Sequence, residues 1–405
     1  MRFLIPLSII LFLDWYAFQT LRTALTWRTP LVLYWLISAS LYAFFIFGIV
    51  YDFRFWNAPW RIYVTGAFLS LLVFKVILAV FSGIDDIGRL VRWVAKFFTS
   101  PNPVAEGVPI TRSRFLAQTG MALAGIPFAA LVWGMVRNAY NYRVEQVALP
   151  IPNLPDELSG LKIVQISDIH TGSFAMKSPI QKAIDLIADI DPDLVFFTGD
   201  LVNFRADEAT PYIPIFRQIK AKLGVFSVLG NHDYGDYVDW QTPNGRTENR
   251  RIIEETHRQM GWELLCNENQ VVEKNGHRIA IIGVENWSSH PRFPRYGNLQ
   301  KAYQGCEDCS AKLLLSHDPS HWRAEVLPKY PDINAVFSGH THGLQFGIKF
   351  SGFKWSPVQY SYDEWYGLYS DNKQHLYVNP GFGYVGYPGR VGFLPEITVF
   401  TLQKA

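Results

Sequence analysis

The chain has 405 residues, which is long enough for two or three domains. Hydrophobic residues make up 49% of it and charged residues 18%; the charged fraction lies below the roughly 25% of soluble domains, so we expect part of the chain in a membrane. The formal net charge of +2 gives no basic field that would favour nucleic acid, which we do not expect as a partner.

Four apolar stretches predict a membrane domain at residues 1–137, with helices at 3–20, 31–50, 62–81 and 115–136. The stretch 31–50 carries no charge, and its length matches the roughly 20 residues needed to cross a bilayer core. Asp14 and Lys75 interrupt two of the stretches. Because a lone charge inside the bilayer is costly, we expect these two side chains to pair within a four-helix bundle; the alternative is that each reaches water.

Basic residues beside the spans favour one orientation. The segment 83–114 holds the largest group of lysines and arginines near any span, and such groups lie on the cytoplasmic side. Four spans then place the C-terminal part on the outer face, although Arg54, Arg61, Arg137 and Arg143 argue for the opposite orientation.

The character of the chain changes after residue 137. Pro150, Pro152 and Pro155 indicate a linker at 138–160. From 161 to 405, short apolar runs alternate with longer polar segments, and residues 179–192 carry apolar side chains at the spacing of one helix face. This alternation predicts an α/β domain in which helices cover mixed strands.

Metal-ligating side chains follow five of the apolar runs directly. They are Asp168 and His170, Asp200, Asn231 and His232, His317, and His340 and His342. In an α/β fold the ends of such strands meet at one edge, where ligands bind. Without His232 there are still seven oxygen and nitrogen donors. These are too many for one tetrahedral ion but suit two divalent ions that share a carboxylate.

Each motif taken alone has an ordinary explanation. Asp and His after a strand are common turn and capping residues, Asn231 suits a left-handed turn, and His340 with His342 would suit a buried core pair. Five such strand ends in order make coincidence a poor explanation. We therefore interpret them as one site.

The series D-x-H, G-D, G-N-H-D, H and G-H-x-H occupies residues 168–170, 199–200, 230–233, 317 and 339–342. It resembles the calcineurin-like metallophosphoesterases, and most closely their membrane-anchored bacterial branch. The resemblance covers residue 161 to the C-terminus. It implies a four-layer α/β/β/α sandwich with two metal ions, each manganese, iron or zinc.

The same resemblance implies a role for each motif residue. One metal would be held by Asp168, His170 and His342, the other by Asn231, His317 and His340, and Asp200 would bridge them. His232 would be the general acid, and Asp233 would orient its loop. The sequence departs from the family pattern at Leu344, where a glycine is often found.

The implied activity is hydrolysis of a phosphate ester, by in-line attack of a hydroxide that bridges the two metals. We expect a phosphodiester or pyrophosphate of the envelope or a lipid, because the domain is tied to a membrane. The expected place is the outer face of the bacterial cytoplasmic membrane. Two alternatives remain: a catalytically silent receptor or scaffold that binds a phosphorylated ligand, and a cytoplasm-facing pyrophosphatase of lipid precursors.

Two loops are candidates for substrate binding. Residues 286–298 include Arg292 and Arg295, and the glycine-rich segment 380–393 includes Arg390; guanidinium groups suit phosphate, but both loops would also suit packing turns. Cys306 and Cys309 have a C-x-x-C spacing, for which a local disulfide and two free thiols both remain open.

Overall fold

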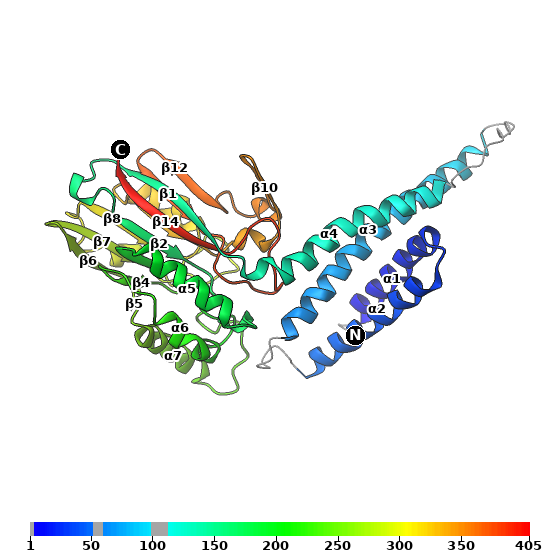
Figure 1. Ribbon diagram of the computed structural model, residues 1–405, viewed down its shortest axis with the longest axis horizontal. Coiled ribbons are helices and arrows are strands. Elements are labelled where there is room, and N and C mark those ends of the chain that lie inside the picture. The colour runs from blue at the N-terminus through cyan, green and yellow to red at the C-terminus, as the bar shows by residue number, and fades with distance from the viewer. Residues whose placement is uncertain (1–3, 52–59, 99–111) are drawn as a thin grey trace. The chain divides into compact units, whose positions relative to one another are not determined.

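The structure is a computed structural model that describes residues 4–51, 60–98 and 112–405 (Figure 1). The chain divides into two compact units, Met1–Trp133 and Gly134–Ala405. The first residue of the expected span 3–20 lies outside the described residues.

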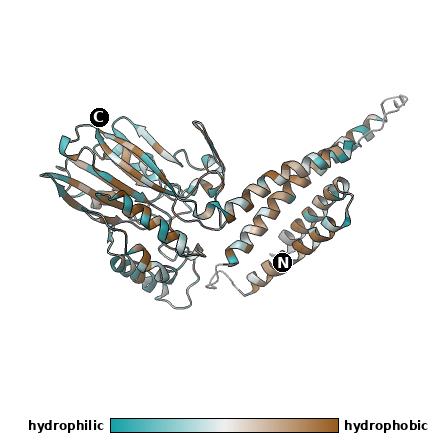
Figure 2. Ribbon diagram, viewed as in Figure 1, coloured by the Kyte–Doolittle hydropathy of each residue, from teal (hydrophilic) through white to brown (hydrophobic). Residues whose placement is uncertain are grey.

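The described residues of the first unit form four helices: α1 (Leu4–Ala24), α2 (Arg28–Val50), α3 (Trp60–Ala95) and α4 (Arg112–Val136). Three helical segments are long and apolar enough to cross a membrane, namely Arg28–Gly48, Arg61–Ala95 and Arg112–Val136. Helix α1, the first of the four predicted spans, is not among them. Figure 2 shows hydrophobic residues along all four helices. Three of the four predicted spans thus have the length and composition to cross a membrane, and the fourth crossing stays a prediction.

The expected ion pair inside the helical unit is confirmed. Lys75 Nζ lies 2.5 Å from Asp14 Oδ1, and both side chains are buried. The ammonium also donates to Ser38 Oγ at 2.9 Å and to Tyr42 OH at 3.0 Å, while Tyr34 OH donates to Asp14 Oδ1 at 3.1 Å. The pair thus links α1, α2 and α3.

The second unit contains two six-stranded sheets and a small hairpin. The first sheet has the order β1-β14-β2-β3-β4-β5, the second β12-β13-β9-β8-β7-β6, and β10 pairs with β11. The strands are β1 (Arg143–Ile151), β2 (Lys162–Ile166), β3 (Leu194–Phe197), β4 (Val225–Ser227), β5 (Glu263–Leu264), β6 (Glu268–Lys274), β7 (His277–Gly283), β8 (Ala311–Leu315), β9 (Ala335–Ser338), β10 (Ile348–Phe350), β11 (Phe353–Trp355), β12 (Gly367–Asp371), β13 (Gln374–Val378) and β14 (Glu396–Lys404).

One hydrophobic core joins the two sheets. It includes Phe196 of β3 and Phe337 of β9, whose rings meet edge to face with centroids 5.0 Å apart. A buried strand has a continuous apolar sequence, and the short apolar runs seen in the sequence after residue 160 correspond to β2, β3, β4, β7, β8, β9, β13 and β14. The expected α/β class is confirmed, and the four-layer arrangement stays a prediction.

Helices pack on these sheets through apolar faces. The predicted helix in 179–192 is α5 (Ser178–Ile190), and its buried residues Ile180, Ala183, Ile184 and Ile187 follow the expected spacing. The other helices are α6 (Ile213–Phe216), α7 (Gly245–Met260), α8 (Leu299–Tyr303) and α9 (Leu327–Lys329). Residues of α8 share a core with β7 and β8.

The segment 138–160 is not a free linker. Residues 143–151 form β1, which pairs in parallel with β14 along its whole length, from Arg143 beside Glu396 to Ile151 beside Lys404. Proline suggested a linker, yet β1 is the edge strand of its sheet, where a proline removes no ladder hydrogen bond on the open side. The second unit therefore begins before residue 161.

Candidate metal centre

The predicted ligands lie at the ends of neighbouring parallel strands. β2, β3 and β4 are parallel neighbours in the first sheet, and β8 and β9 are parallel neighbours in the second. The loops after these five strands carry the ligand motifs: 168–170 after β2, 200 after β3, 231–232 after β4, 317 after β8 and 340–342 after β9. Parallel strands end at one edge, so both sheets bring their loops to a shared site.

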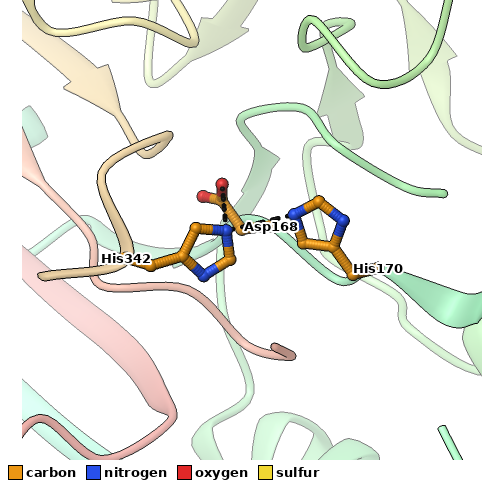
Figure 3. A group of neighbouring side chains, drawn as sticks. All are labelled: Asp168, His170 and His342. Carbon is orange, nitrogen blue, oxygen red and sulfur yellow. Dashed lines mark hydrogen bonds and ion pairs between the residues drawn. The ribbon is translucent and has the colours of Figure 1, made fainter. Parts of the chain in front are cut away.

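The first group of ligands is Asp168, His170 and His342, whose ligand atoms lie within 4.8 Å of one another. His342 Nε2 lies 3.1 Å from Asp168 Oδ1 and 3.1 Å from His170 Nε2 (Figure 3). All three side chains are buried. Two imidazole nitrogens and a carboxylate oxygen therefore point at one another in a place that water barely reaches.

The second group is Asp200, His317 and His340. His317 Nε2 lies 3.2 Å from Asp200 Oδ2 and 3.3 Å from His340 Nδ1. The same Asp200 oxygen lies 3.6 Å from His170 Nε2 in the first group. One carboxylate oxygen thus faces both groups, as a bridging ligand must.

Asn231 supplies an independent observation. Its side chain is buried, and its Oδ1 has no hydrogen-bond partner among the described residues, while its Nδ2 donates to Tyr237 OH at 2.9 Å. An unpaired buried acceptor costs free energy unless something satisfies it. A divalent cation beside Asp200 would satisfy it, so the residues present fit the two metals that the motifs imply.

The nitrogens of these rings that do not face the site are held by the protein. His170 Nδ1 donates to Asn203 Oδ1 at 3.0 Å, His317 Nδ1 to the Thr198 carbonyl at 2.7 Å, and His340 Nε2 to Tyr362 OH at 2.8 Å. Such bonds fix the tautomer and orientation of metal-binding histidines. The other nitrogen of each ring is thereby directed into the site.

Sequence reasoning missed three of the residues that hold the ligands. Asn203 follows Asp200 by three positions in the same loop, so its place after β3 was a usable signal. Asp318 follows His317 directly and accepts from Tyr362 OH at 3.3 Å. Tyr362 itself lies in a loop without a motif, and nothing in the sequence marks it.

Most of the ligand residues have left-handed backbone. Positive φ values occur at Asp168 (50°), His170 (51°), Asp200 (61°), His340 (70°) and His342 (53°). Non-glycine residues pay roughly 1–2 kcal/mol for this conformation, and such strain concentrates at functional sites. Leu344, the departure from the family pattern, also has φ 52°, which explains why glycine is common there.

The charge pattern keeps the bridging carboxylate ionised. Burial alone would raise the pKa of Asp200, but the nearby His317 and His232 rings hold it well below its usual range. Burial alone would lower the pKa of His317, but the Asp200 carboxylate raises it to about 10. A cation between these two side chains would replace that proton.

His232 is fixed on one side and free on the other. Its Nδ1 donates to the Asn203 carbonyl at 2.6 Å, and its backbone N–H donates to Asp200 Oδ1 at 2.8 Å. The ring lies edge to face against His170, with centroids 4.9 Å apart. Because Nδ1 is committed, Nε2 is the nitrogen left for a leaving oxygen.

Asp233 serves as a hydrogen-bond acceptor for backbone. Its carboxylate accepts N–H bonds from Asp200, Leu201 and Gly230 at 2.8–2.9 Å. Burial and the Asp200 charge raise the pKa of Asp233 to about 7. The side chain joins the loops after β3 and β4 and does not face the ligand groups.

The three candidate arginines have different surroundings. Arg390 is fully buried and donates to the carbonyls of Pro380 and Gly383; its Nη2 lies 3.5 Å from His342 Nδ1. Arg295 donates to the carbonyls of Ser288 and Ser289, the latter at 2.8 Å. Both therefore hold loops in place, although Arg295, like Arg292, is exposed.

Arg292 is an exposed residue whose neighbour in the chain contacts a candidate ligand. The next residue, Phe293, packs edge to face on His340 with centroids 4.6 Å apart, and Arg292 lies over the Phe293 ring at 5.8 Å.

At the C-x-x-C motif, Cys306 and Cys309 are both free and buried, and Cys306 Sγ donates to the Tyr303 carbonyl at 2.8 Å.

Comparison with known proteins agrees with both units. Residues 1–139 match the family described as probable calcineurin-like phosphoesterase, transmembrane domain, and residues 161–344 match calcineurin-like phosphoesterase. The chain is 31% identical over 349 residues to a transmembrane protein with metallophosphoesterase domain from Danio rerio, covering 84% of this chain and 72% of that one.

Two bacterial proteins are similar at lower identity. The phosphodiesterase YaeI of Escherichia coli is 26% identical, covering 72% of this chain and 99% of its own. The UDP-2,3-diacylglucosamine pyrophosphatase LpxG of Chlamydia trachomatis is 27% identical, covering 64% of this chain and 88% of its own. Relatives thus come from vertebrates as well as bacteria. The sequence motifs, the ligand geometry and these matches agree, and the chain belongs to the transmembrane calcineurin-like metallophosphoesterases.

Proposed function

We propose that the chain is a membrane-anchored phosphoesterase with two divalent metals, whose catalytic domain is a four-layer α/β/β/α sandwich. One observation carries the proposal: Asp200 Oδ2 faces His170 Nε2 at 3.6 Å and His317 Nε2 at 3.2 Å. This geometry is the one a dinuclear site with a bridging carboxylate requires.

Each ligand has a role in this proposal. Asp168, His170 and His342 would hold one metal, Asn231, His317 and His340 the other, and Asp200 both. The pair of cations supplies Lewis-acid polarisation of phosphate and activation of water. His232 Nε2 would donate a proton to, or hydrogen-bond, the leaving oxygen, with the ring held by the Asn203 carbonyl.

The experiment is metal reconstitution of the full chain in detergent. Purified protein is stripped with a chelator, and hydrolysis of bis-p-nitrophenyl phosphate and p-nitrophenyl phosphate is followed as manganese, iron or zinc returns. We expect metal-dependent turnover, a fall of roughly 10²–10⁴-fold in kcat for His232→Ala with metal content unchanged, and loss of metal for Asp200→Asn. His277→Ala, a half-buried histidine on β7, is the matched control.

The same experiment distinguishes the proposed enzyme from the rival function, a receptor without catalytic activity. A silent receptor would bind manganese and a phosphate analogue such as vanadate but turn over neither chromogenic substrate nor lipids. Folded, metal-loaded protein with that behaviour would contradict the enzyme and support the receptor. The complete ligand set with His232 favours the enzyme, since a binding module has no use for a proton donor.

For the substrate we propose a phosphodiester or pyrophosphate that is part of a lipid or of the envelope. The membrane unit keeps the domain near lipids, and the relative LpxG is named for a lipid-linked pyrophosphate. We further propose that the catalytic domain lies on the outer face of a bacterial cytoplasmic membrane. Protease access to a C-terminal tag in intact cells tests the placement, and protection of the tag would favour the cytoplasm-facing pyrophosphatase.

Arg292 is the proposed contact to a second anionic group of the substrate. Its neighbour Phe293 packs on the ligand His340, so an exposed guanidinium lies beside the site. Arg292→Ala should lower kcat/KM for a pyrophosphate substrate roughly tenfold or more, mainly through KM, and should leave bis-p-nitrophenyl phosphate hydrolysis unchanged. Equal losses on both substrates would contradict this role.

A further inference from the structure

A polar cavity of about 320 Å³ lies within the helical unit, between α1, α3 and α4. Its volume falls in the range of roughly 300–1,000 Å³ typical of small-ligand sites. The residues that matter for its chemistry are Tyr16, Thr20, Ser82, Asp85, Asp86 and Arg89. None of them belongs to the metal centre, and no sequence motif indicates a site at these residues.

The side chains around the cavity are organised by hydrogen bonds. Arg89 donates to Asp85 Oδ2 from Nε at 3.0 Å and from Nη2 at 2.5 Å. Tyr16 OH donates to Asp86 Oδ2 at 2.8 Å, and the hydroxyls of Thr20 and Ser82 contact each other. These bonds join α1 to α3, and Arg89 Nη2 also lies 3.4 Å from Ser113 Oγ of α4.

One acceptor in this arrangement is left without a donor. Asp85 is 5% exposed; the Ser113 hydroxyl also lies beside its carboxylate, but Oδ1 has no hydrogen-bond partner among the described residues. A buried carboxylate oxygen without a hydrogen bond costs free energy, so this oxygen favours a ligand that donates an N–H group. The ionisable residues that line the cavity, Asp85, Asp86 and Arg89, carry a formal charge of −1, which favours a cationic group.

The cavity lies beside the part of α3 that follows its apolar stretch. The stretch 62–81 covers roughly 30 Å at 1.5 Å per residue, which is the thickness of a bilayer core. Phe81, Ser82, Asp85 and Arg89 line the cavity over the following turns. This is the depth of lipid headgroups.

We propose that this cavity binds the headgroup of a phospholipid with a primary amine. The ammonium group would donate to Asp85 Oδ1 and offset the charge of that carboxylate, and the phosphate would lie near Arg89. A quaternary ammonium has no N–H to give to Asp85, so phosphatidylcholine lacks the required donor. An anionic headgroup without an amine would add charge of the wrong sign.

The test compares headgroups on one acyl chain length. Short-chain phosphatidylethanolamine, phosphatidylcholine and phosphatidylglycerol are titrated into the full chain in detergent, with binding followed by microscale thermophoresis and by retained lipid in native mass spectrometry. We expect phosphatidylethanolamine to bind roughly tenfold or more tightly than either other lipid, since a hydrogen bond to a charged group is at stake.

Two variants address the cavity in different ways. Asp85→Asn removes the charge but keeps the shape, and Ala117→Leu fills the space from α4 without touching a carboxylate; Ala117 lines the cavity and is 5% exposed. Both should abolish the preference for phosphatidylethanolamine. Lys96→Gln, at an exposed position just after α3 and outside the cavity lining, should retain it.

Three outcomes would overturn the proposal. Equal binding of the ethanolamine and choline lipids would mean that no N–H donor is recognised. Retention of the preference in folded Ala117→Leu would place the site elsewhere. Binding of free phosphoethanolamine as tight as that of the lipid would assign the cavity to a soluble amine and not to the bilayer. Because Ala117→Leu leaves the Asp85 and Arg89 pair intact, the test does not depend on Asp85→Asn folding.

Discussion

At the scale of single residues, the candidate centre depends on side chains that never face a substrate. His340 is held through Nε2 by Tyr362 OH, which in turn donates to Asp318 Oδ2. This chain of hydrogen bonds leaves Nδ1 directed at His317 Nε2, 3.3 Å away. Tyr362 is therefore a positioning residue for a metal ligand.

We predict that Tyr362→Phe lowers metal affinity by about 10–100-fold, because partners of ligating histidines have effects of that size. The ring volume stays nearly the same, so stability should change little. Competition with a chelating dye measures the affinity directly, apart from turnover. Tyr360→Phe, a tyrosine that is 78% exposed, is the control. An unchanged affinity in Tyr362→Phe would mean that packing alone holds His340.

His257 gives a pH prediction outside the metal centre. It is buried on α7, and Ser227 Oγ lies 2.9 Å from its Nδ1. Burial and Arg250 lower the pKa of His257 to about 3, whereas the unfolded value is about 6.5. The unfolded chain therefore binds more protons between these values. Stability from this residue is complete above pH about 6.5 and falls as the pH drops toward 3.

The expected slope for His257 is about 1.4 kcal/mol per pH unit in that window. Urea denaturation midpoints of the full chain at pH 6.5, 5.5 and 4.5 should show a component that disappears in His257→Gln. The same substitution at His277, which is half-buried and pairs with Glu157 at 3.1 Å, should keep the slope. A slope that survives in His257→Gln would assign the acid sensitivity to other groups.

At the scale of elements, the sequence predicts strands well when they are wholly buried. The run at 194–197 is buried at every position, and an unbroken apolar run is recognisable without knowing its neighbours. β6 and β12 alternate between half-buried and exposed residues, so their sequences look like polar loops. β1 was missed because Pro150 and Pro152 resembled linker residues, although an edge strand tolerates Pro150 and Pro152 lies just beyond the strand.

The grouping of the candidate ligands was predictable for the same reason, since each follows a recognisable strand. Asp200 lies three residues after the buried strand β3, so topology alone brings it to the shared edge. Tyr362 lies in the loop between β11 and β12, where no periodic pattern fixes its place. Arg390 appeared suited to phosphate by its chemistry, yet the structure buries it among carbonyls, and burial is not readable from a glycine-rich segment.

β1 yields a stability prediction at this scale. Leu149 and Ile151 are buried at 1% and 0% exposure in the core between the sheets. Leu149→Ala should cost about 2–5 kcal/mol through lost burial and the cavity left behind. Val144→Ala on the same strand, where the side chain is 37% exposed, should cost much less. Denaturant midpoints of the full chain compare the two, and equal midpoints would mean that β1 contributes little to the fold.

At the scale of the whole molecule, each unit has its own polar centre and its own hydrophobic core. The metal centre is built entirely from residues of Gly134–Ala405, and the Asp14–Lys75 pair entirely from residues of Met1–Trp133. Hydrolysis of a small soluble ester needs only the first of these. The membrane unit then matters for folding, for placement beside lipids and for the proposed headgroup site.

Variants of the Asp14–Lys75 pair test whether the helical unit and the metal centre have separate roles. Replacing one member of a buried pair leaves an uncompensated charge and costs about 3–5 kcal/mol, whereas replacing both with apolar residues is often close to neutral. Lys75→Met should therefore lower the melting temperature of the detergent-solubilised chain, and Asp14→Leu with Lys75→Met should restore most of it. The double variant should also keep full metal-dependent hydrolysis of bis-p-nitrophenyl phosphate.

A stable single variant would mean that the charge of Asp14 is tolerated alone, because water or Tyr34 and Tyr42 satisfy it. A stable double variant without hydrolysis would mean that this ion pair takes part in catalysis and that the helical unit is more than an anchor.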